Sequence, residues 1–309
     1  MDTYKVAVLI PCYNEAISIT DVVGGFRQAL PDADIYVFDN NSTDDTVERA
    51  RQAGAIVRYE SRQGKGHVVQ KMFASVEADI YVLVDGDATY HAPACPGMIR
   101  KLLDEDLDMV VGKRLHSDTD AYRRGHVFGN LLFTRTIQGI FGNTISDLLS
   151  GYRVFSRRFV KSYPCFSKGF EVETDMTVHA LHLNLPIGEL ETPYHPRPDN
   201  SASKLNTYRD GLKILYKILS LFLYEKPKIF MGLISFFLIL LAVLLAAPLV
   251  GTWMETGLVP RLPTAILCSS LALLALGALA MGVLLEAVQK SRKAATYLAY
   301  LAQRGTPHV

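Results

Sequence analysis

Ile80-Tyr81-Val82-Leu83-Val84-Asp85-Gly86-Asp87 is a mostly aliphatic run that ends in two aspartates separated by one glycine. A short apolar run rich in β-branched residues is typical of a strand buried on both faces of a parallel sheet, and ligands bind such sheets beyond the carboxyl ends of the strands. At that end, Asp85 and Asp87 can present oxygen ligands to a hard divalent cation, and Gly86 leaves room for a diphosphate to approach the backbone. An Asp-Gly pair is also a common hairpin turn without chemistry, so the neighbouring segments decide between the two interpretations.

The neighbouring segments alternate between strand and helix patterns. Strands are predicted at 4–10, 35–38 and 56–59, and a helix pattern follows each of them. This alternation predicts an α/β fold with a parallel sheet, in which the carboxyl ends of the strands meet at one edge. The acids at or just past these ends are Glu15, Asp39, Asp85 and Asp87. Four acids at one edge are much less easily explained by chance than two, which favours a binding site.

The polar residues after the predicted strands form ordered motifs. The first four are Pro11-x-Tyr13-Asn14-Glu15, Asp39-Asn-x-Ser42-x-Asp44-x-Thr46, Gly64-Lys65-Gly66 and Asp85-Gly86-Asp87. In this order they resemble the nucleotide-sugar motifs of family 2 glycosyltransferases, and the resemblance implies a Rossmann-like nucleotide-diphospho-sugar transferase (GT-A) domain. The similarity continues through Gly112-Lys113-Arg114, Asp147-x-x-Ser150-Gly151-x-Arg153 and Arg197-x-x-x-Ser201-x-Ser203-Lys204. Together with two apolar C-terminal segments, it resembles the polyprenyl-phosphate (dolichol-phosphate-like) branch of that family.

The resemblance implies a role for each motif residue. A divalent Mg²⁺ or Mn²⁺ would be held by Asp85 and Asp87. The nucleotide sugar would be bound by Pro11, Tyr13, Glu15, Asp39, Lys65, Asp85 and Gly86. The acceptor phosphate would be bound by Arg114, Arg123, Ser150, Arg197 and Lys204. The catalytic set would be Asp87, Asp147 and Arg153.

Some roles stay open within this set. Asp147 is either a catalytic acid or base, or a residue that orients Arg153 through an ion pair, and we favour a positioning or electrostatic role. A helix predicted from Phe170 begins with several acids, of which Glu171 and Glu173 either border the sugar pocket or form an exposed acidic first turn. The chain departs from the family at Asn40, where an acid is more usual, and at Ala88-Thr89, where many relatives have Leu-Gln with a metal-contacting Gln. The third protein ligand of the metal is therefore open.

Two uncharged apolar segments near the C-terminus, 229–250 and 262–285, are each long enough to cross a hydrocarbon core of about 30 Å as a helix. Basic residues flank the outer ends of the pair, which places both ends in the cytoplasm by the positive-inside rule. An amphipathic helix at 205–228 is expected to lie in the membrane interface. We therefore divide the chain into a catalytic domain at 1–204, this juxtamembrane helix, two transmembrane helices and a cytoplasmic tail at 286–309.

Composition excludes several other classes. The 309 residues carry a net charge of +1 and are 49% hydrophobic, which excludes disorder and gives no support to nucleic-acid binding. The four cysteines are scattered without paired spacing, so neither a zinc site nor a disulfide framework is indicated. The N-terminus leads into a strand pattern and lacks the regions of a signal peptide. The sequence does not determine the oligomeric state, and a homo-oligomer is among the alternatives.

These observations predict an enzyme that transfers a sugar, with inversion, from a UDP- or GDP-sugar to a polyprenyl phosphate at the cytoplasmic membrane face. One alternative is a membrane-bound glycosyltransferase that acts on a growing polysaccharide or glycolipid. A processive synthase would carry a Gln-x-x-Arg-Trp motif, whereas the only tryptophan here is Trp253 in the loop between the apolar segments. A second alternative is a non-catalytic protein that binds a lipid carrier. The identities of the nucleotide, the sugar and the polyprenyl chain are not readable from the sequence.

Overall fold

The structure is a computed structural model that describes residues 4–116, 146–165, 167, 169, 171–196, 226–259 and 261–305. The chain divides into two compact units, which are described separately below. The first combines Met1–Thr207 with Thr296–Val309, and the second is Tyr208–Ala295. Of the segments expected from the sequence, 205–225 in the juxtamembrane helix lies outside the described residues, and the predicted domain division stays a prediction.

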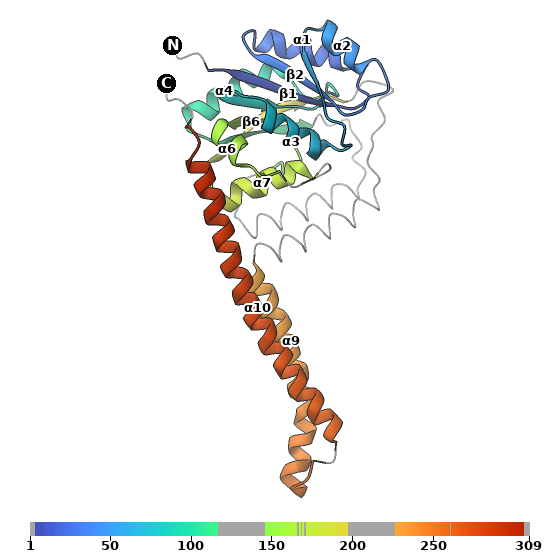
Figure 1. The fold of residues 1–309 in the computed structure, drawn as a ribbon, viewed down its shortest axis with the longest axis vertical. Helices are drawn as coiled ribbons and strands as arrows, with labels where there is room; N and C mark the ends of the chain where they lie inside the picture. The colour runs from blue at the N-terminus through green and yellow to red at the C-terminus, as the bar shows by residue number, and fades with distance from the viewer. Residues whose placement is uncertain are drawn as a thin grey trace. The chain divides into compact units, whose positions relative to one another are not determined.

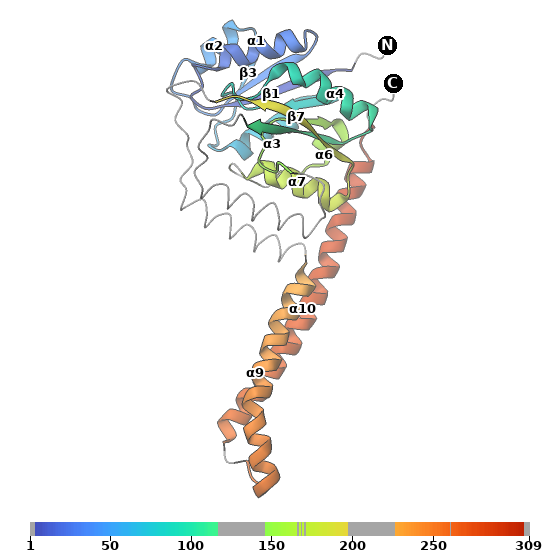
Figure 2. The ribbon, with the colours of Figure 1, turned by 180° about the vertical axis from the view of Figure 1, so that it is seen from behind.

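The first unit is built on a seven-stranded sheet with the order β3-β2-β1-β4-β6-β5-β7 (Figures 1 and 2). Its strands are β1 Val6–Cys12, β2 Asp34–Asp39, β3 Ile56–Tyr59, β4 Ile80–Leu83, β5 Met109–His116, β6 Arg153–Ser156 and β7 Ile187–Tyr194. The strands β1 to β4 are parallel, as the alternating pattern predicts. The carboxyl ends of β1, β2 and β4 therefore meet at one edge, which we call the catalytic edge.

The strand β6 differs from the prediction of a parallel sheet, because it runs antiparallel to both β4 and β5. Its register pairs Arg153 with Leu83, so β6 begins at the catalytic edge, and pairs Ser156 with Ile80 at the opposite edge. The strand β5 ends at the catalytic edge, and β6 starts there, so the chain enters β6 in the reverse direction. This reversal brings the segment 147–152 to the catalytic edge.

Helices cover both faces of the sheet (Figure 1). They are α1 Ile19–Ala29, α2 Thr46–Gln52, α3 Lys65–Ser75, α4 Cys95–Asp104, α6 Arg157–Ser162 and α7 Val172–Leu183, with a short 3₁₀ helix at Ala92–Ala94. The buried face of α1 shows why such segments fold as helices: Ile19, Val22, Val23 and Phe26 recur at helical spacing and pack on the sheet. The core on this face combines α1 and α4 with apolar side chains of β1, β2, β4 and β6. The opposite face is covered by α3, α6 and α7.

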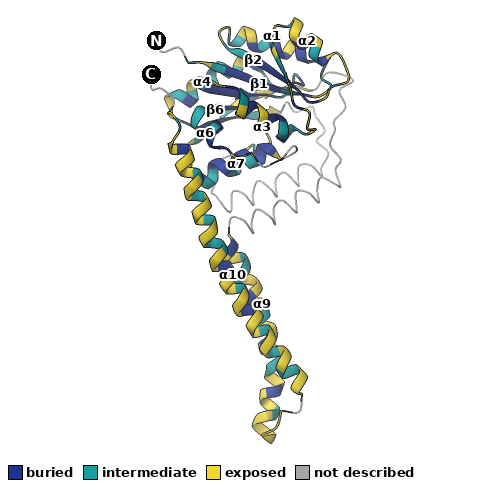
Figure 3. Cartoon of the chain, in the orientation of Figure 1, coloured by how far each residue is buried: buried dark blue, intermediate teal, exposed yellow. Residues whose placement is uncertain are grey.

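The second unit contains two long apolar helices, α9 Pro227–Thr256 and the larger part of α10 Leu262–Leu301. Both are long and apolar enough to cross a membrane. Figure 3 shows that most of their residues are exposed, in contrast to the buried strands of the sheet. The two helices approach closely at Gly282, where an added Cβ would lie 2.9 Å from the Cβ of Met231. Glu286 of α10 pairs with Lys228 of α9 at 3.8 Å and with Lys290 at 3.1 Å.

The C-terminal end of α10 groups with the sheet-containing unit. Tyr300 is buried there, and its hydroxyl donates a hydrogen bond of 2.8 Å to Oδ2 of Asp108. The guanidinium of Arg158 lies over the Tyr300 ring at 5.3 Å from its centroid. Asp108 precedes β5, so this contact is made at the edge of the sheet opposite the catalytic edge.

Candidate active site

The four predicted acids gather around the carboxyl end of β1, where Cys12 is buried. Burial raises the pKa of the Cys12 thiol well above its usual range, and the negative charges of Glu15, Asp39, Asp85 and Asp87 raise it further. Charges change the pKa of a thiol measurably only at short range, so all four carboxylates lie close to Cys12. The catalytic edge thus concentrates negative charge, which suits a site for cations or for a ligand carried by a cation.

The first two motifs form one structural unit. Asn14 adopts a left-handed backbone with φ of 54°, and its side-chain oxygen accepts a hydrogen bond of 2.8 Å from the backbone N–H of Thr43. In return, the backbone N–H of Asn14 donates to Ser42 Oγ at 2.9 Å, and that of Glu15 donates to Thr46 Oγ1 at 2.8 Å. Because of these bonds residues 13–18 form a loop, and α1 begins only at Ile19. The motif residues therefore hold the loop that presents Tyr13 and Glu15.

Asp39 ends β2 and is 3% exposed. Its two carboxylate oxygens accept the backbone N–H of Ser42 at 3.3 and 3.2 Å. The carboxylate is thereby fixed beside the loop that carries Asn14 and Glu15. Pro11 and Tyr13 lie before and within this loop, and Tyr13 is 37% exposed. The structure thus brings the predicted nucleoside-binding residues of the first two motifs together.

Asn40, the residue after Asp39, has a structural role. Its side-chain amide donates to the carbonyl oxygens of Glu60 at 2.8 Å and Arg62 at 2.9 Å. Its side-chain oxygen accepts the backbone N–H of Gly64 at 2.7 Å. An ionised carboxylate has no hydrogen to donate to two carbonyls, so only an amide satisfies this arrangement. Asn40 therefore fixes the loop that leads into α3 and its first residue, Lys65.

The turn after β4 carries the two aspartates around Gly86. A Cβ at Gly86 would lie 2.7 Å from Cys12 Sγ, so the close packing of β1 and this turn requires glycine. The Gly86 carbonyl accepts a hydrogen bond of 2.7 Å from Ser18 Oγ. Oδ1 of Asp87 accepts from the Thr89 backbone N–H at 3.2 Å and from Thr89 Oγ1 at 2.6 Å. Thr89 thus orients the Asp87 carboxylate.

Lys65 connects this turn with α7. Its ammonium pairs with both Asp85 and Glu173, and the side chains of Lys65 and Glu173 are 9% and 6% exposed. Burial alone lowers the pKa of Lys65, but the two carboxylates overcome that effect and raise the pKa above its usual range. Glu173 is therefore buried at the site and is not part of an exposed acidic turn. The sequence placed it near the start of a helix but gave no sign of its partner.

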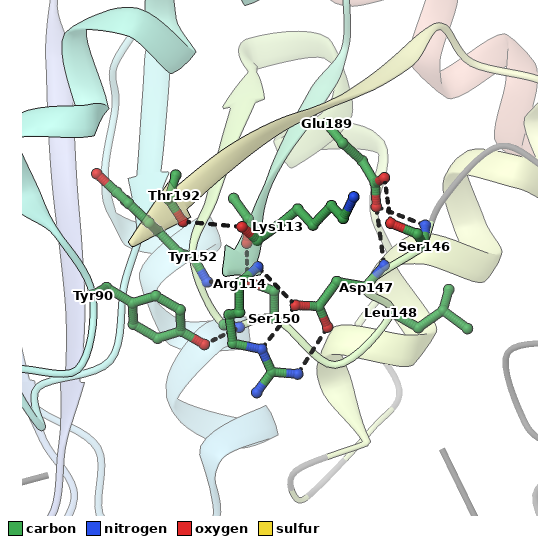
Figure 4. Close-up of polar contacts among 12 residues, drawn as sticks. Tyr90, Lys113, Arg114, Ser146, Asp147, Leu148, Ser150, Tyr152, Glu189 and Thr192 are labelled. Atoms are coloured by element: carbon green, nitrogen blue, oxygen red, sulfur yellow. Dashed lines mark hydrogen bonds and ion pairs between the residues drawn. The ribbon is translucent and has the colours of Figure 1, made fainter. Parts of the chain in front are cut away.

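Asp147 pairs with Arg114 (Figure 4). The guanidinium donates to both carboxylate oxygens at 2.8 Å, and the Arg114 backbone N–H donates to Oδ2 at 3.1 Å. Burial pushes the pKa of Asp147 up, but the hydrogen bonds and charge of Arg114 outweigh burial and hold the pKa below its usual range. Of the alternatives considered for Asp147, an ion pair is present, and its partner is Arg114 rather than Arg153.

Glu189 of β7 supports this pair, and the sequence patterns did not indicate it. Its Oε1 accepts the backbone N–H of Ser146 at 2.7 Å and that of Asp147 at 3.0 Å (Figure 4). Its Oε2 accepts from Ser146 Oγ at 2.7 Å. Glu189 thus fixes the backbone from which the Asp147 side chain reaches Arg114. No local motif marks this role, because the partners lie about forty positions apart in the chain.

Arg153 and Ser150 are fully buried. The Arg153 guanidinium donates to the carbonyl oxygens of Ser150 at 2.9 Å and Leu148 at 2.7 Å, and to Thr177 Oγ1 at 2.7 Å. Ser150 Oγ donates to the Gly112 carbonyl at 2.6 Å. In this structure both side chains therefore hold the loop 148–153 in place, and neither presents a polar atom to solvent.

This loop meets the segment 85–90, which contains the aspartate turn, through two contacts. A Cβ at Gly151 would lie 2.5 Å from Oδ2 of Asp85, so a larger residue would displace the Asp85 carboxylate. The backbone N–H of Gly151 donates a hydrogen bond of 2.8 Å to the hydroxyl of Tyr90. The predicted donor residues and the segment 147–152, which begins with Asp147, therefore adjoin one another at the catalytic edge.

Comparisons with known proteins identify the family. The model described as Glycosyl transferase family 2 matches residues 7–163. The chain belongs to glycosyl transferase family 2. Among its relatives, Glycosyltransferase AglJ of Haloferax volcanii is 34% identical over 233 residues, covering 75% of this chain and 76% of the relative. The Dolichyl-phosphate hexose transferase of the same organism is 25% identical over 223 residues, covering 72% and 96%.

The fold of this family 2 glycosyltransferase is also found in solved structures. Glucosyl-3-phosphoglycerate synthase from Mycobacterium tuberculosis, in a complex with Mn²⁺, UDP-glucose and phosphoglyceric acid, matches with a TM-score of 0.58 and 24% identity. The match covers 70% of this chain and 79% of that protein. The predicted family and the GT-A-like α/β fold are thereby confirmed.

The aspartate turn of this glycosyltransferase has the donor chemistry for a divalent cation. Within the described residues no group of three His, Cys, Asp or Glu side chains forms a ready metal cage. Mg²⁺ at phosphate-transfer sites is commonly bound by one or two carboxylates together with substrate phosphates, so two aspartates are sufficient protein ligands. Asp87 is held by Thr89. Asp85 is paired with the Lys65 ammonium, and a metal cation can supply the same positive charge beside this carboxylate. The residues present therefore fit Mg²⁺ or Mn²⁺ bound together with a diphosphate.

Three predicted acceptor residues, Arg123, Arg197 and Lys204, lie outside the described residues.

Proposed function

We propose that this glycosyltransferase moves a sugar, with inversion, from a UDP- or GDP-sugar to a polyprenyl phosphate at the cytoplasmic face of a membrane. The observation that carries the proposal is the contact of the aspartate turn with the loop of Asp147 in a chain that also has two apolar helices. This contact brings the segment of the Arg114–Asp147 pair next to the aspartates. It therefore joins residues suited to a metal-bound diphosphate with a guanidinium suited to a phosphate. The relative named as a dolichyl-phosphate hexose transferase supports the same acceptor class.

On the donor side, Glu15, Asp39 and the loop of Pro11 and Tyr13 would bind the nucleoside. Asp85, Gly86 and Asp87 would bind the diphosphate through Mg²⁺ or Mn²⁺, which when bound supplies Lewis-acid stabilisation of the departing nucleoside diphosphate. The Lys65 ammonium lies against Asp85, and in this position it would add positive charge beside the leaving group. The acids thereby fix the donor, while Lys65 stabilises charge that develops on it.

On the acceptor side, Arg114 would bind the lipid phosphate. A guanidinium binds phosphate oxygens in the same bidentate fashion in which Arg114 now binds Asp147. An oxygen of the phosphate would attack the anomeric carbon from the face opposite the diphosphate, the bond from that carbon to the diphosphate oxygen would break, and the electron pair would leave on that oxygen with the nucleoside diphosphate. The second pKa of a phosphate monoester is near 6, so the acceptor is largely anionic at neutral pH and needs no strong base. Asp147 then acts by positioning Arg114, and Arg153 and Ser150 act by positioning the loop.

The helices α9 and α10 would anchor the enzyme as a membrane hairpin. Their apolar surface is mostly exposed, as expected of lipid-facing helices. Lys228 lies at the start of α9 and Lys290 after the apolar part of α10, and both pair with Glu286, so the two lysines mark the same end of the helix pair. By the positive-inside rule these ends face the cytoplasm, and so does the catalytic domain that precedes them. Catalysis would then take place on the side of the membrane to which the cytoplasmic leaflet presents its lipid phosphates.

The test is transfer by the full-length protein in detergent or nanodiscs with polyprenyl phosphate. A panel of labelled UDP- and GDP-sugars is supplied with Mn²⁺ or Mg²⁺, and label should enter an organic-extractable, mild-acid-labile product. Arg114→Ala should raise KM for the lipid phosphate at least tenfold. Arg51→Ala is a matched control, because this exposed arginine of α2 binds only a neutral group, the Tyr59 hydroxyl at 2.8 Å, among its described contacts. Label found only in a water-soluble glycan across the panel would refute the lipid-phosphate acceptor and favour a polysaccharide acceptor.

A further inference from the structure

The Lys65 ammonium lies between two carboxylates that come from different parts of the chain. Asp85 follows β4, and Glu173 belongs to the first turn of α7. The side chain of Asp85 is 27% exposed, whereas that of Glu173 is 6% exposed. The inner partner of the lysine is therefore Glu173, and the outer partner is a proposed metal ligand.

The charges in this group set how strongly it attracts a cation. One ammonium between two carboxylates leaves one net negative charge, and Asp87 beside them contributes another. Without the carboxylate of Glu173, the positive charge of Lys65 would be balanced by Asp85 alone. The lysine would then compete directly with any cation for that carboxylate.

We propose that Glu173 is a positioning residue that holds and neutralises Lys65, so that Asp85 remains available to a divalent cation carried with the donor. This inference rests on the proposed function and gives a role to a residue outside the motif set. It predicts that Glu173 acts on cation affinity through Lys65 and contacts neither the cation nor the acceptor.

The position of Glu173 in the fold suits this role. It is held in a twelve-residue helix, α7, and its backbone carbonyl accepts a hydrogen bond of 3.1 Å from Thr177 Oγ1. The same hydroxyl accepts from the Arg153 guanidinium. The turn that carries Glu173 is thus tied to the buried arginine behind the loop 148–153, and a rigid support of this kind fixes the carboxylate against which Lys65 is placed.

The experiment measures Mn²⁺ binding directly, by electron paramagnetic resonance of free Mn²⁺, on the full-length protein in detergent. Titrations are run with Mn²⁺ alone, with UDP and with GDP. Glu173→Gln should weaken Mn²⁺ binding about tenfold, because one unit of negative charge is lost close to the cation in a partly screened site. Asp175→Asn removes an acid from the same first turn of α7 and should change Mn²⁺ affinity less than twofold.

A double variant separates this role from a purely structural one. In Lys65→Met combined with Glu173→Gln, the competing ammonium is gone, so Mn²⁺ affinity should return to within about threefold of wild type, while turnover stays low because Lys65 is missing. A merely structural role for Glu173 would leave the double variant as weak as Glu173→Gln or weaker. Thermal melts of each variant show whether the fold is kept.

Each remaining outcome counts against the inference or against its basis. If Glu173→Gln binds Mn²⁺ as wild type does, or if the double variant does not recover, the inference is wrong and the proposed function stands. If wild type binds no Mn²⁺ with either nucleotide, the metal assignment within the proposed function fails, and the inference fails with it.

Discussion

The two edges of the sheet hold their charged groups in different ways. At the catalytic edge, the groups assigned to ligand binding include two sets of ion pairs: Lys65 with Asp85 and Glu173, and Arg114 with Asp147. At the opposite edge, the buried Asp108 is held by neutral donors, accepting from Ser156 Oγ at 2.5 Å and from the Tyr300 hydroxyl at 2.8 Å. An ion pair can exchange its partner for a charged ligand, whereas a hydroxyl bond within a packed contact mainly adds stability. Substitutions in these ion pairs should therefore mainly change activity, and those at the opposite edge should change stability.

The largest effect is expected for Asp87→Asn at the catalytic edge. Loss of one carboxylate from a site for a divalent cation should lower turnover at least about 10³-fold, roughly 4 kcal/mol of transition-state stabilisation. The melting temperature should stay close to that of wild type, because an amide oxygen still accepts the hydrogen bonds from Thr89. Turnover is measured by transfer of labelled sugar, with Asp104→Asn on α4 as the control acid. Near wild-type transfer by the Asp87 variant with Mn²⁺ or Mg²⁺ would remove the metal assignment.

Arg153 and Arg114 sharpen the comparison within one edge. Arg153→Met should lower the free energy of unfolding by about 4 kcal/mol, because three buried acceptors lose their donor and each unsatisfied group costs about 1–3 kcal/mol. Arg114→Met should cost about half as much, because the Asp147 carboxylate keeps the backbone N–H of Arg114 as a donor. Denaturant unfolding measures both. Equal losses for the two arginines would contradict the distinction between a structural and a ligand-binding arginine.

The same two arginines show what the sequence could predict. Strands β1 to β4, the motifs at their carboxyl ends and the apolar helices follow from local patterns, since each depends on residues near one another in the chain. The burial of Arg153 depends on Thr177, and the positions of Lys65 and Asp147 depend on Glu173 and Glu189. Those contacts join distant segments. The antiparallel direction of β6 likewise depends on where the chain re-enters the sheet, and the sequence of a buried four-residue strand does not reveal its direction.

A pH effect of intermediate size is expected from His179, which is buried in α7. It packs against the rings of Phe159 and Tyr163, and burial lowers its pKa to about 4. In the unfolded chain the pKa is near 6.5, so between these values the unfolded state binds more protons. Stability should therefore fall as pH decreases from 6.5 towards 4, by about 3 kcal/mol in total.

The measurement is denaturant unfolding at a series of pH values, with His179→Phe as the comparison. Phenylalanine keeps the ring contacts but cannot bind a proton, so the decline attributable to position 179 should disappear. An unchanged pH dependence in that variant would show that another group is responsible.

The smallest effect is expected at the opposite edge, from Tyr300→Phe. This change removes one hydroxyl donor from the buried Asp108 and keeps the ring beneath Arg158, so the free energy of unfolding should fall by about 1 kcal/mol. Burial raises the pKa of Asp108, and the Tyr300 hydroxyl opposes that rise by stabilising the carboxylate. The loss should therefore be largest where Asp108 is ionised and should shrink as the pH is lowered and Asp108 takes up a proton. Tyr297→Phe is the matched control, because Tyr297 stacks on Tyr300 and is 43% exposed. Turnover should stay within twofold of wild type in both variants; a loss of turnover in Tyr300→Phe without a change in melting temperature would show that the two edges are not separate in function.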